Sequence, residues 1–542
     1  VREGMNVYQS LFASNQGITQ DASISPTTYP ALFPAGSANF SDASLPSRIS
    51  TLPGAPTYPI PATFTTSLNG IDPSLKMGYV QSWNLSFQRE LGRDSVIDVR
   101  YVGNHGTDLW RQMNINETNI LENGFLNEFK IAQNNLTIAR SGDITKQATN
   151  NFGNQGLPGQ QNVPILQTAI GTTNDSTTAT QLMLGQAGTT ANGIATNSAR
   201  MAALTAKGYP ANMFQVNPTV GSGGSYVLNN TGASYFNALQ IEVRRRLSTG
   251  LQVSGSYQWA KSMAIGATAS SSDFNTPTTL RNLGLDRVPS AYDIRNAIKM
   301  NWIYELPYGP GRHFGATAHP MMKHVFGGWQ LSGVVRLQSG TPLFLNGLGT
   351  FNQTGSAAGS GIALHNITGS QLQSMVGVYK TSIIGPNGGT VFYLPAPSTL
   401  STAGVTGANN TNIITNTMAA FNMGGFTPAQ VDPNAPYIGP APAGQLGWEG
   451  YIYLPWQRHF DLELQKNIRI TERVQLQIAA AALDVLNMTN FLPGTTPTGG
   501  TGGGNTSSTN PFFGQIGSAY RDVSGTVDPG ARIIEFHVRL NF

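Results

Sequence analysis

The sequence predicts an all-β fold, the C-terminal portion of an antiparallel transmembrane β-barrel with about nine or more long strands and long extracellular loops. Long segments alternate apolar and polar residues, the connections between them alternate in length, and aromatic residues gather near the segment ends. The last strand is the clearest, because successive strand side chains face opposite sides. One of its faces carries Ile534, Phe536, Val538, Leu540 and Phe542, and the other carries Glu535, His537, Arg539 and Asn541.

Eight further segments alternate in the same way. Their length suits a strand that crosses a bilayer, about 9 to 11 residues, better than a soluble strand of about 5 to 6. The three residues Ser248, Thr249 and Gly250 join two of the segments in a hairpin. The expected lipid face, with one residue from each of the nine strands, comprises Leu85, Val99, Ile241, Val253, Ile298, Val335, Leu464, Ile478 and Val538.

The connections are short and long in turn. Transmembrane barrels have short periplasmic turns and long extracellular loops, so residues 105–234, 340–457 and 487–530 are predicted to be loops at the cell surface. The chain is divided into an extended, proline-rich extracellular segment, 1–78, and a barrel portion, 79–542. The final strand then runs inward and leaves Phe542 on the periplasmic side.

Aromatic residues are expected at the two membrane interfaces, where an apolar ring and a polar edge are both satisfied. Tyr79, Trp83, Tyr257 and Trp259 are predicted at the outer interface, Trp329 and Phe542 at the inner one, and Trp302 is a further interface aromatic. The alternative is that these side chains form the core of a soluble β-sandwich, whose strands seldom keep period two for this length.

Composition agrees with a membrane barrel. Only 11% of the residues are charged, whereas soluble domains have roughly 25%, and cysteine is absent. A formal charge of +4 favours no nucleic-acid partner, and no apolar run is long enough for a transmembrane helix. No catalytic or cofactor site is expected. A soft-metal site is one interpretation of His313, His319 and His324 with Met321 and Met322, but an ordinary polar turn is favoured and no metal is expected.

The long loops are poor in charge and rich in Asn, Thr, Gly and Gln. Such surfaces suit a neutral ligand, a carbohydrate or a peptide, although plain solvated loops that shield the barrel mouth explain them equally well. Within the first loop, apolar residues recur near helical spacing and predict a short amphipathic helix that packs the loop onto the barrel. They are Ile120, Leu121, Phe125, Leu126, Phe129, Ala132 and Leu136.

Several blocks of sequence resemble one known family. Residues 71–76 (Ile-Asp-Pro-Ser-Leu-Lys), 79–91 and 99–106 are followed in order by blocks at 234–240, 293–296, 327–333, 339–342 and 487–491. Together they resemble the barrel of the Oar-like TonB-dependent receptors that are common in acidobacteria. The resemblance implies a barrel of about 22 strands, an internal plug, a periplasmic TonB-binding box and often an N-terminal carboxypeptidase-regulatory-like sandwich.

Nine strands form an open sheet, and unpaired backbone groups at its edges are costly in lipid. The chain is therefore expected to be the C-terminal part of a longer outer-membrane receptor that contacts the TonB complex through its upstream part. The other partners expected are outer-membrane lipid and the barrel-assembly machinery, which would read Phe536, Val538, Leu540 and Phe542 as an assembly signal. A monomer is expected. A passive porin or surface scaffold, and a soluble adhesin with long strands, remain as alternatives to a receptor.

Overall fold

A computed structural model describes residues 62–140, 149–265, 277–290, 292–309, 312–345, 349–352, 361–385, 388–394, 437–448, 450–471, 474–488, 490–492, 518–519 and 532–542. Within these ranges, no helix has both the length and the apolar character that a membrane crossing demands. Most of the predicted extracellular segment 1–78, and much of the predicted loops 340–457 and 487–530, lies outside the described residues.

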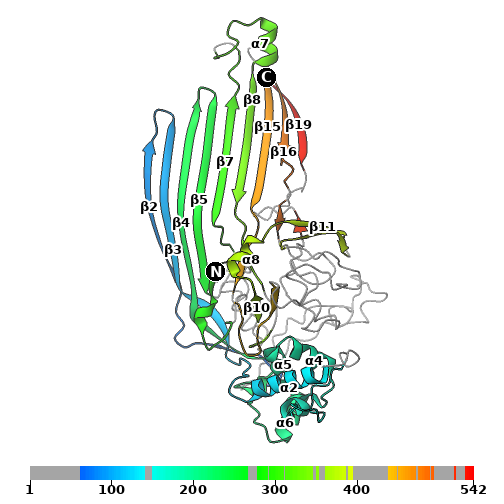
Figure 1. Cartoon of the computed structure of the whole chain (residues 1–542). Coiled ribbons are helices and arrows are strands. Elements are labelled where there is room, and N and C mark those ends of the chain that lie inside the picture. Colours follow the sequence, from blue (N-terminus) through cyan, green and yellow to red (C-terminus); the bar gives the residue numbers. More distant parts are fainter. Residues whose placement is uncertain are drawn as a thin grey trace, which may run out of the picture.

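Nine long strands form one sheet in which each strand pairs with its neighbour in sequence (Figure 1). All eight pairings are antiparallel, which confirms the predicted meander. The strands are β2 (Tyr79–Glu90), β3 (Ser95–Asn114), β4 (Ser225–Ser248), β5 (Leu251–Ile265), β7 (Asn296–Glu305), β8 (Trp329–Gln338), β15 (Gln457–Arg469), β16 (Gln475–Leu483) and β19 (Ile533–Asn541). Two short strands join this sheet, β1 (Leu68–Ile71) in parallel with β4, and β6 (Arg287–Pro289) against β5.

Cross-strand partners share one face of a sheet, so the register tests the predicted lipid face. Val99 is opposite Ile241, which is opposite Tyr257, and Tyr257 is opposite Ile298. The same row-by-row pairing continues to β19, where Val538 is opposite Ile478. All nine predicted residues lie on one face, which confirms the assignment of the apolar side.

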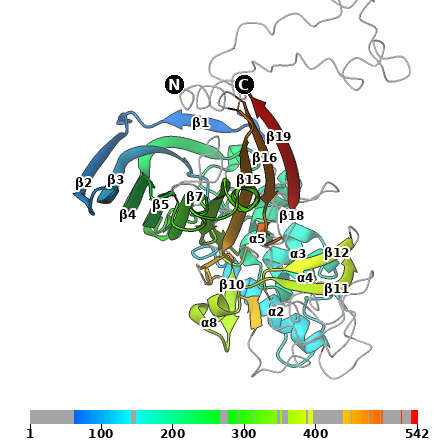
Figure 2. The same ribbon diagram turned by 90° about the horizontal axis from the view of Figure 1, so that it is seen from above.

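The two ends of the sheet differ. One end, called here the turn end, carries the tight hairpins, the helix α7 (Pro320–Phe326) and the C-terminus (Figure 1). The opposite end, called here the loop end, carries all the other helices and four two-stranded sheets. Seen along the strands, the main sheet curves from β2 to β19 (Figure 2).

β3 and β4 are longer than the sequence indicated, so the connection between them runs over residues 115–224 rather than 105–234. The pairing continues as far as Asn114 and Tyr226, with register shifts between Gly106 and Arg111. This extension lacks a regular apolar row because strands that continue beyond the membrane face no lipid on either side. Backbone hydrogen bonds hold the two extensions together, and such bonds leave no alternating pattern of side chains from which a strand can be predicted.

The connection 115–224 is a folded helical subdomain. It contains α2 (Phe125–Arg140), α3 (Pro164–Ile170), α4 (Ser176–Met183), α5 (Ala187–Ala195), α6 (Ser198–Ala206) and the 3-10 helix η6 (Pro218–Val220). The predicted amphipathic helix is α2. Its apolar side packs into a common core with α3 to α6, so the prediction that it packs the loop onto the barrel is wrong. Asp175 caps α4 and Asn197 caps α6, each accepting backbone hydrogen bonds in the first helical turn. Only α2 was predicted.

Short strands make up the rest of the loop end. They are β9 (Pro342–Phe344) with β14 (Tyr451–Tyr453), β10 (Ile362–His365) with β13 (Tyr437–Pro440), β11 (Tyr379–Gly385) with β12 (Gly388–Phe392), and β17 (Phe491–Leu492) with β18 (Ser518–Ala519). A one-turn helix, α8 (Gly369–Ser374), begins with a capping box formed by Thr368 and Gln371, and the 3-10 helix η7 (Leu283–Asp286) precedes β6. A second core lies here, formed by Leu345, Ile362, Leu372, Tyr393, Leu394, Ile438, Ile452 and Leu454.

Candidate functional site

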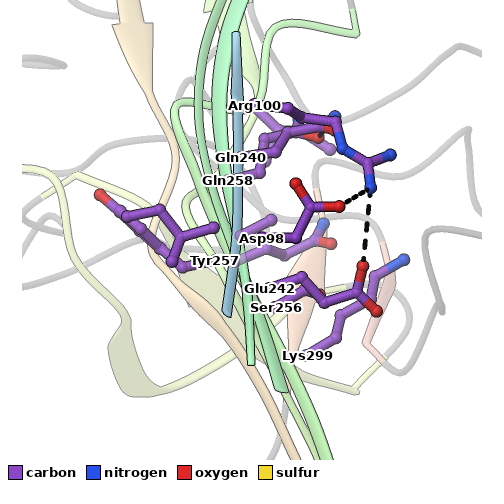
Figure 3. A pocket seen from close by; sticks show the side chains of 12 residues that line it. Asp98, Arg100, Gln240, Glu242, Ser256, Tyr257, Gln258 and Lys299 are labelled. Carbon is purple, nitrogen blue, oxygen red and sulfur yellow. Dashed lines mark hydrogen bonds and ion pairs between the residues drawn. The ribbon is translucent and has the colours of Figure 1, made fainter. Parts of the chain in front are cut away.

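The polar face of the main sheet is the candidate functional surface. A hollow of about 300 Å³ lies on β3, β4, β5 and β7, and the side chains that line it include Asp98, Arg100, Glu242 and Lys299. Figure 3 shows these four side chains on one side of the sheet, whereas Tyr257 points to the other side. The alternation of each strand therefore separates a charged surface from an aromatic one within the thickness of a single sheet.

Charges on this face are paired within strands and between neighbouring strands. The Arg100 guanidinium donates to the Asp98 carboxylate at 2.6 Å and lies 3.9 Å from Glu242 Oε2 (Figure 3). Arg244 Nε lies 2.5 Å from Glu242 Oε1. Beside them, Gln240 Nε2 donates to Gln258 Oε1 at 3.1 Å. Paired charges and amides give this surface hydrogen-bonding capacity without a single dominant sign, so it suits water and neutral polar solutes better than one class of ion.

A buried ion pair fixes the mouth of this surface at the loop end. Arg111, near the end of β3, donates to Asp286 Oδ2 at 2.5 Å, and both side chains are almost fully buried. Thr278 donates to Asp286 Oδ1 through its backbone and its hydroxyl group. Asn352 Nδ2 donates to the Thr278 carbonyl at 2.5 Å and to Glu117 Oε1 at 2.7 Å. One network thus connects the sheet, the start of the helical subdomain and the segment after β9.

A second cluster ties β14 to the start of β7. The Tyr453 hydroxyl donates to Asp293 Oδ2 at 2.5 Å and accepts from Arg295 Nε at 3.0 Å, and Arg295 pairs with Asp293 at 3.1 Å. Burial, together with the Asp293 carboxylate, raises the pKa of the Tyr453 hydroxyl, so it stays protonated and remains a donor. The rings of Phe344, Tyr451 and Tyr453 meet edge to face, which leaves an aromatic ladder beside this polar cluster.

The predicted interface aromatics fall at two levels along the strands. Tyr79, Trp83 and Trp259 lie toward the loop end, and Trp302 and Trp329 lie toward the turn end. Tyr257 is opposite Ile241 and Ile298 and lies between the two levels. Trp83 is paired with Gly103 and Trp302 with Gly333, and each indole occupies the space where a Cβ of that glycine would be. Except for Tyr257, their positions agree with two girdles, and a girdle in a membrane remains a prediction.

The predicted assembly signal lies on β19. Phe536, Val538 and Leu540 share the apolar face of that strand, are opposite Ala480, Ile478 and Leu476, and are largely exposed. Phe542 follows the strand and is 97% exposed. Recognition of these residues by an assembly machinery remains a prediction.

Sequence reasoning missed charged residues on the apolar face, among them Arg245 and Lys466. Arg245 is opposite Val253, and Lys466 is opposite Trp329 and Ile478. The signal was present, because Lys466 interrupts the apolar row of Phe460, Leu462, Leu464 and Ile468. A charge in a lipid-facing row calls for a specific partner, and Lys466 has one in α7.

The soft-metal hypothesis for the turn between β7 and β8 gains no support. Within the described ranges, no group of three His, Cys, Asp or Glu side chains could hold a metal ion. His319 instead begins α7, where its Nδ1 accepts from the Met321 backbone N–H at 3.3 Å. His324 lies in the last turn of the same helix.

No curated protein matches the sequence. Among solved structures, the Escherichia coli outer membrane transporter YddB is similar at 9% identity and TM-score 0.30, with 89% of this chain and 34% of that chain covered. The FrpB iron transporter from Neisseria meningitidis is similar at 6% identity and TM-score 0.28, with 88% of this chain and 33% of that chain covered. The Pseudomonas putida toluene transporter TodX is similar at 7% identity and TM-score 0.15, with 76% of this chain and 56% of that chain covered. The chain spans about a third of the first two proteins, and TM-scores this low carry no argument about function.

The family comparison is decisive because it covers almost the whole chain. The model of the outer membrane β-barrel domain matches residues 2–534. It agrees with the long antiparallel meander, its single apolar face and the paired charges on the opposite face. This chain belongs to the outer membrane β-barrel domain family and is a protein of the outer membrane.

Proposed function

We propose that this chain forms part of the barrel of an outer-membrane TonB-dependent receptor, of the Oar-like type that its sequence blocks resemble. Family membership supports the barrel. The observation that carries the receptor function is the buried Arg111–Asp286 network, which holds the helical subdomain, the sheet and the segment around Asn352 in one arrangement. A receptor needs a preorganised mouth of this kind in order to select a ligand before transport.

The proposed ligand is neutral and polar, a carbohydrate or a peptide. Hydrogen-bonding side chains and the aromatic ladder of Phe344, Tyr451 and Tyr453 lie at the loop end, and the charges beneath them are paired. Sugar rings and peptide side chains both use flat aromatic faces together with hydrogen bonds. In this proposal the loop end faces the cell exterior and the turn end faces the periplasm, as short turns do in barrels of this class.

The second candidate function is that of a passive porin. It is favoured by the hollow on the polar face, because a water-filled lumen with balanced charges passes small polar solutes without energy. A surface scaffold without transport is a further version of this alternative.

The experiment that separates these functions uses the complete protein in its own cells. Uptake of a labelled ligand is measured with and without TonB, and with and without the proton gradient. A receptor loses uptake in both depletions and keeps surface binding, because energy moves a plug and is not needed for docking. Unchanged uptake without TonB would establish the passive pore. Loss of binding together with uptake would show that the measured signal depends on membrane integrity.

A further inference from the structure

The turn between β7 and β8 contains an apolar helix that is mostly exposed, although the Phe326 ring meets the Tyr308 ring edge to face at 5.7 Å. In α7, Met321, Met322, Val325 and Phe326 are all exposed, and none of the helix residues is buried. At about 100° per residue, these four side chains lie within about 140° of the helix circumference. The helix therefore presents one continuous apolar side, with Lys323 outside it.

Two side chains from the apolar face of the sheet hold this helix. Lys466 Nζ donates to the carbonyl oxygens of His324 at 2.6 Å and Val325 at 3.1 Å, and it also donates to the Gly327 carbonyl. Trp329 Nε1 donates to the Val325 carbonyl at 2.9 Å, and its ring centroid lies 5.2 Å from Lys466 Nζ. A cation placed on the last carbonyls of a helix satisfies groups that have no partner within the helix and complements its dipole.

The position of Lys466 decides which side of the sheet the helix is attached to. Lys466 is opposite Trp329 and Ile478 and lies in the same row as Leu464, so its side chain leaves the sheet on the apolar face. The end of α7 is therefore fixed to the lipid-facing surface and not to the polar face. These contacts place α7 at the turn-end border of that surface.

The charge of the turn fits a phospholipid boundary. Residues 306–328 contain Arg312, Lys323 and three histidines and no acidic residue. Arg312 is paired with Glu305, which leaves Lys323 as the cation on the helix itself. An amphipathic helix with a basic flank binds where headgroups meet acyl chains, and anionic lipid strengthens that binding.

We propose that α7 is an interfacial membrane helix: Met321, Met322, Val325 and Phe326 insert among phospholipid chains at the turn end of the barrel, and Lys466 with Trp329 anchors the helix to the lipid-facing sheet. The occupant of the apolar side is phospholipid, not another protein segment. This inference rests on the barrel family and is independent of energised transport.

Residues 1–542 contain no cysteine, so single-cysteine labelling gives a direct test once any cysteine elsewhere in the complete protein is replaced by serine. Met322→Cys carries a polarity-sensitive fluorophore in the complete protein, reconstituted into phosphatidylethanolamine–phosphatidylglycerol vesicles. Brominated acyl chains should quench this label strongly and aqueous iodide weakly, as for Leu464→Cys on the lipid face. Thr317→Cys, exposed in the same turn outside the helix, is the matched control and should show the reverse.

The anchor is tested by adding Lys466→Met to Met322→Cys, which should abolish quenching by brominated lipid and restore quenching by iodide. Leu464→Met, on the same row without contact to α7, should change neither. Iodide quenching of Met322→Cys in the parent protein would overturn the proposal in favour of a solvent-exposed helix. If neither brominated lipid nor iodide quenches the label, the proposal is overturned, because another protein segment then covers the apolar side of α7. If Lys466→Met does not assemble, Met322→Cys alone still decides between lipid, water and protein.

Discussion

Each strand carries two rows of side chains, and neighbouring residues on one strand experience different solvents. Ile241 is in the apolar row, opposite Val99 and Tyr257, while Gln240 is in the polar row, opposite Arg100 and Gln258. Ile241 lies about seven residues from the hairpin at Ser248. At about 3.3 Å per residue and a tilt of about 45°, that is about 16 Å along the membrane normal and therefore close to the midplane.

A charge in the apolar row at this depth should destabilise the folded barrel. We expect Ile241→Arg to reduce the free energy of unfolding in lipid vesicles by about 2 to 4 kcal/mol. Gln240→Arg, one residue away, should cost much less because its side chain remains on the hydrated face. The measurement is denaturant-induced unfolding of the reconstituted protein. Equal costs for the two variants would contradict the assigned lipid face.

Glu128 shows how a single buried group joins two elements. Its carboxylate is on α2 and accepts from the backbone N–H of Leu166 at 2.7 Å, within the first turn of α3. No side chain of α3 itself caps that helix, since Val163 precedes Pro164. Burial raises the pKa of Glu128, although the N–H groups of Leu166 and Ile165 oppose the shift.

The raised pKa makes the stability of the helical subdomain depend on pH. Because the folded state holds the proton more tightly, this contribution to stability is fully present below the ordinary pKa of 4.5 and is lost as pH rises through the raised value. Glu128→Gln keeps an acceptor for Leu166 and removes the buried charge, so it should remove this loss and preserve or increase stability at pH 7. Glu128→Ala leaves the N–H group unpaired and should cost about 1 to 3 kcal/mol.

The measurement is hydrogen exchange of residues 120–215, corrected for intrinsic rates, from pH 4 to pH 8. Glu122→Gln is the control. The Arg281 guanidinium lowers the pKa of exposed Glu122, so its contribution is present at neutral pH and is lost on acidification, the opposite direction. A steeper pH dependence in Glu128→Gln than in the parent protein would show that the charged carboxylate is the stabilising form.

At the scale of elements, the nine strands could be predicted because lipid imposes an apolar row on every one of them. The sequence signal ends where the lipid ends. The extensions of β3 and β4 past Gly106 mix apolar residues such as Leu109 and Leu228 with polar ones in no regular alternation. Helix α5, with sequence Ala-Gly-Thr-Thr-Ala-Asn-Gly-Ile-Ala, contains residues that are weak helix formers. Such a helix forms because its buried side joins a core, and that core exists only in the folded subdomain.

The candidate site was less predictable for a related reason. Arg111 and Asp286 are 175 residues apart in sequence, and neither lies in a pattern that indicates the other. The polar row of each strand identified the hydrated face as a whole. The contact of Arg100 with Glu242 on the next strand depends on the register, which the sequence does not show. Lys466 was a visible anomaly, since a cation in an apolar row needs a partner that the sequence does not name.

For the whole molecule, the governing feature is the pair of edges on the main sheet. Among the described strands, β2 and β19 each have one neighbour in this sheet, β3 and β16 respectively. All residues of β2 and nearly all of β19 are exposed. An edge in lipid leaves backbone donors and acceptors without partners, so we infer that further strands close the barrel on both sides.

Phe542 lies at one of these edges. Because its side chain is exposed, its effect on assembly of the barrel can be measured apart from its effect on the stability of the folded barrel. The ring is 97% exposed and follows the last paired residue of β19, Asn541, so its removal deletes little packing. Deleting Phe542, or adding polar residues after it, should therefore lower the amount of assembled barrel in the outer membrane far more than it lowers the stability of barrel already assembled. Phe542→Trp keeps a terminal aromatic and should assemble normally.

The assay is the heat-dependent gel mobility shift of folded barrels, on cell membranes and on protein refolded in detergent. Recognition of the last strand by the assembly machinery acts only in the cell, whereas packing acts in both settings. A selective loss in membranes would support the assembly signal formed by Phe536, Val538, Leu540 and Phe542. Equal losses in both settings would reduce Phe542 to a packing residue, and normal amounts in both would remove the assembly role, leaving pairing of β19 with β16 and with the closing strand as the only function of this end of the chain.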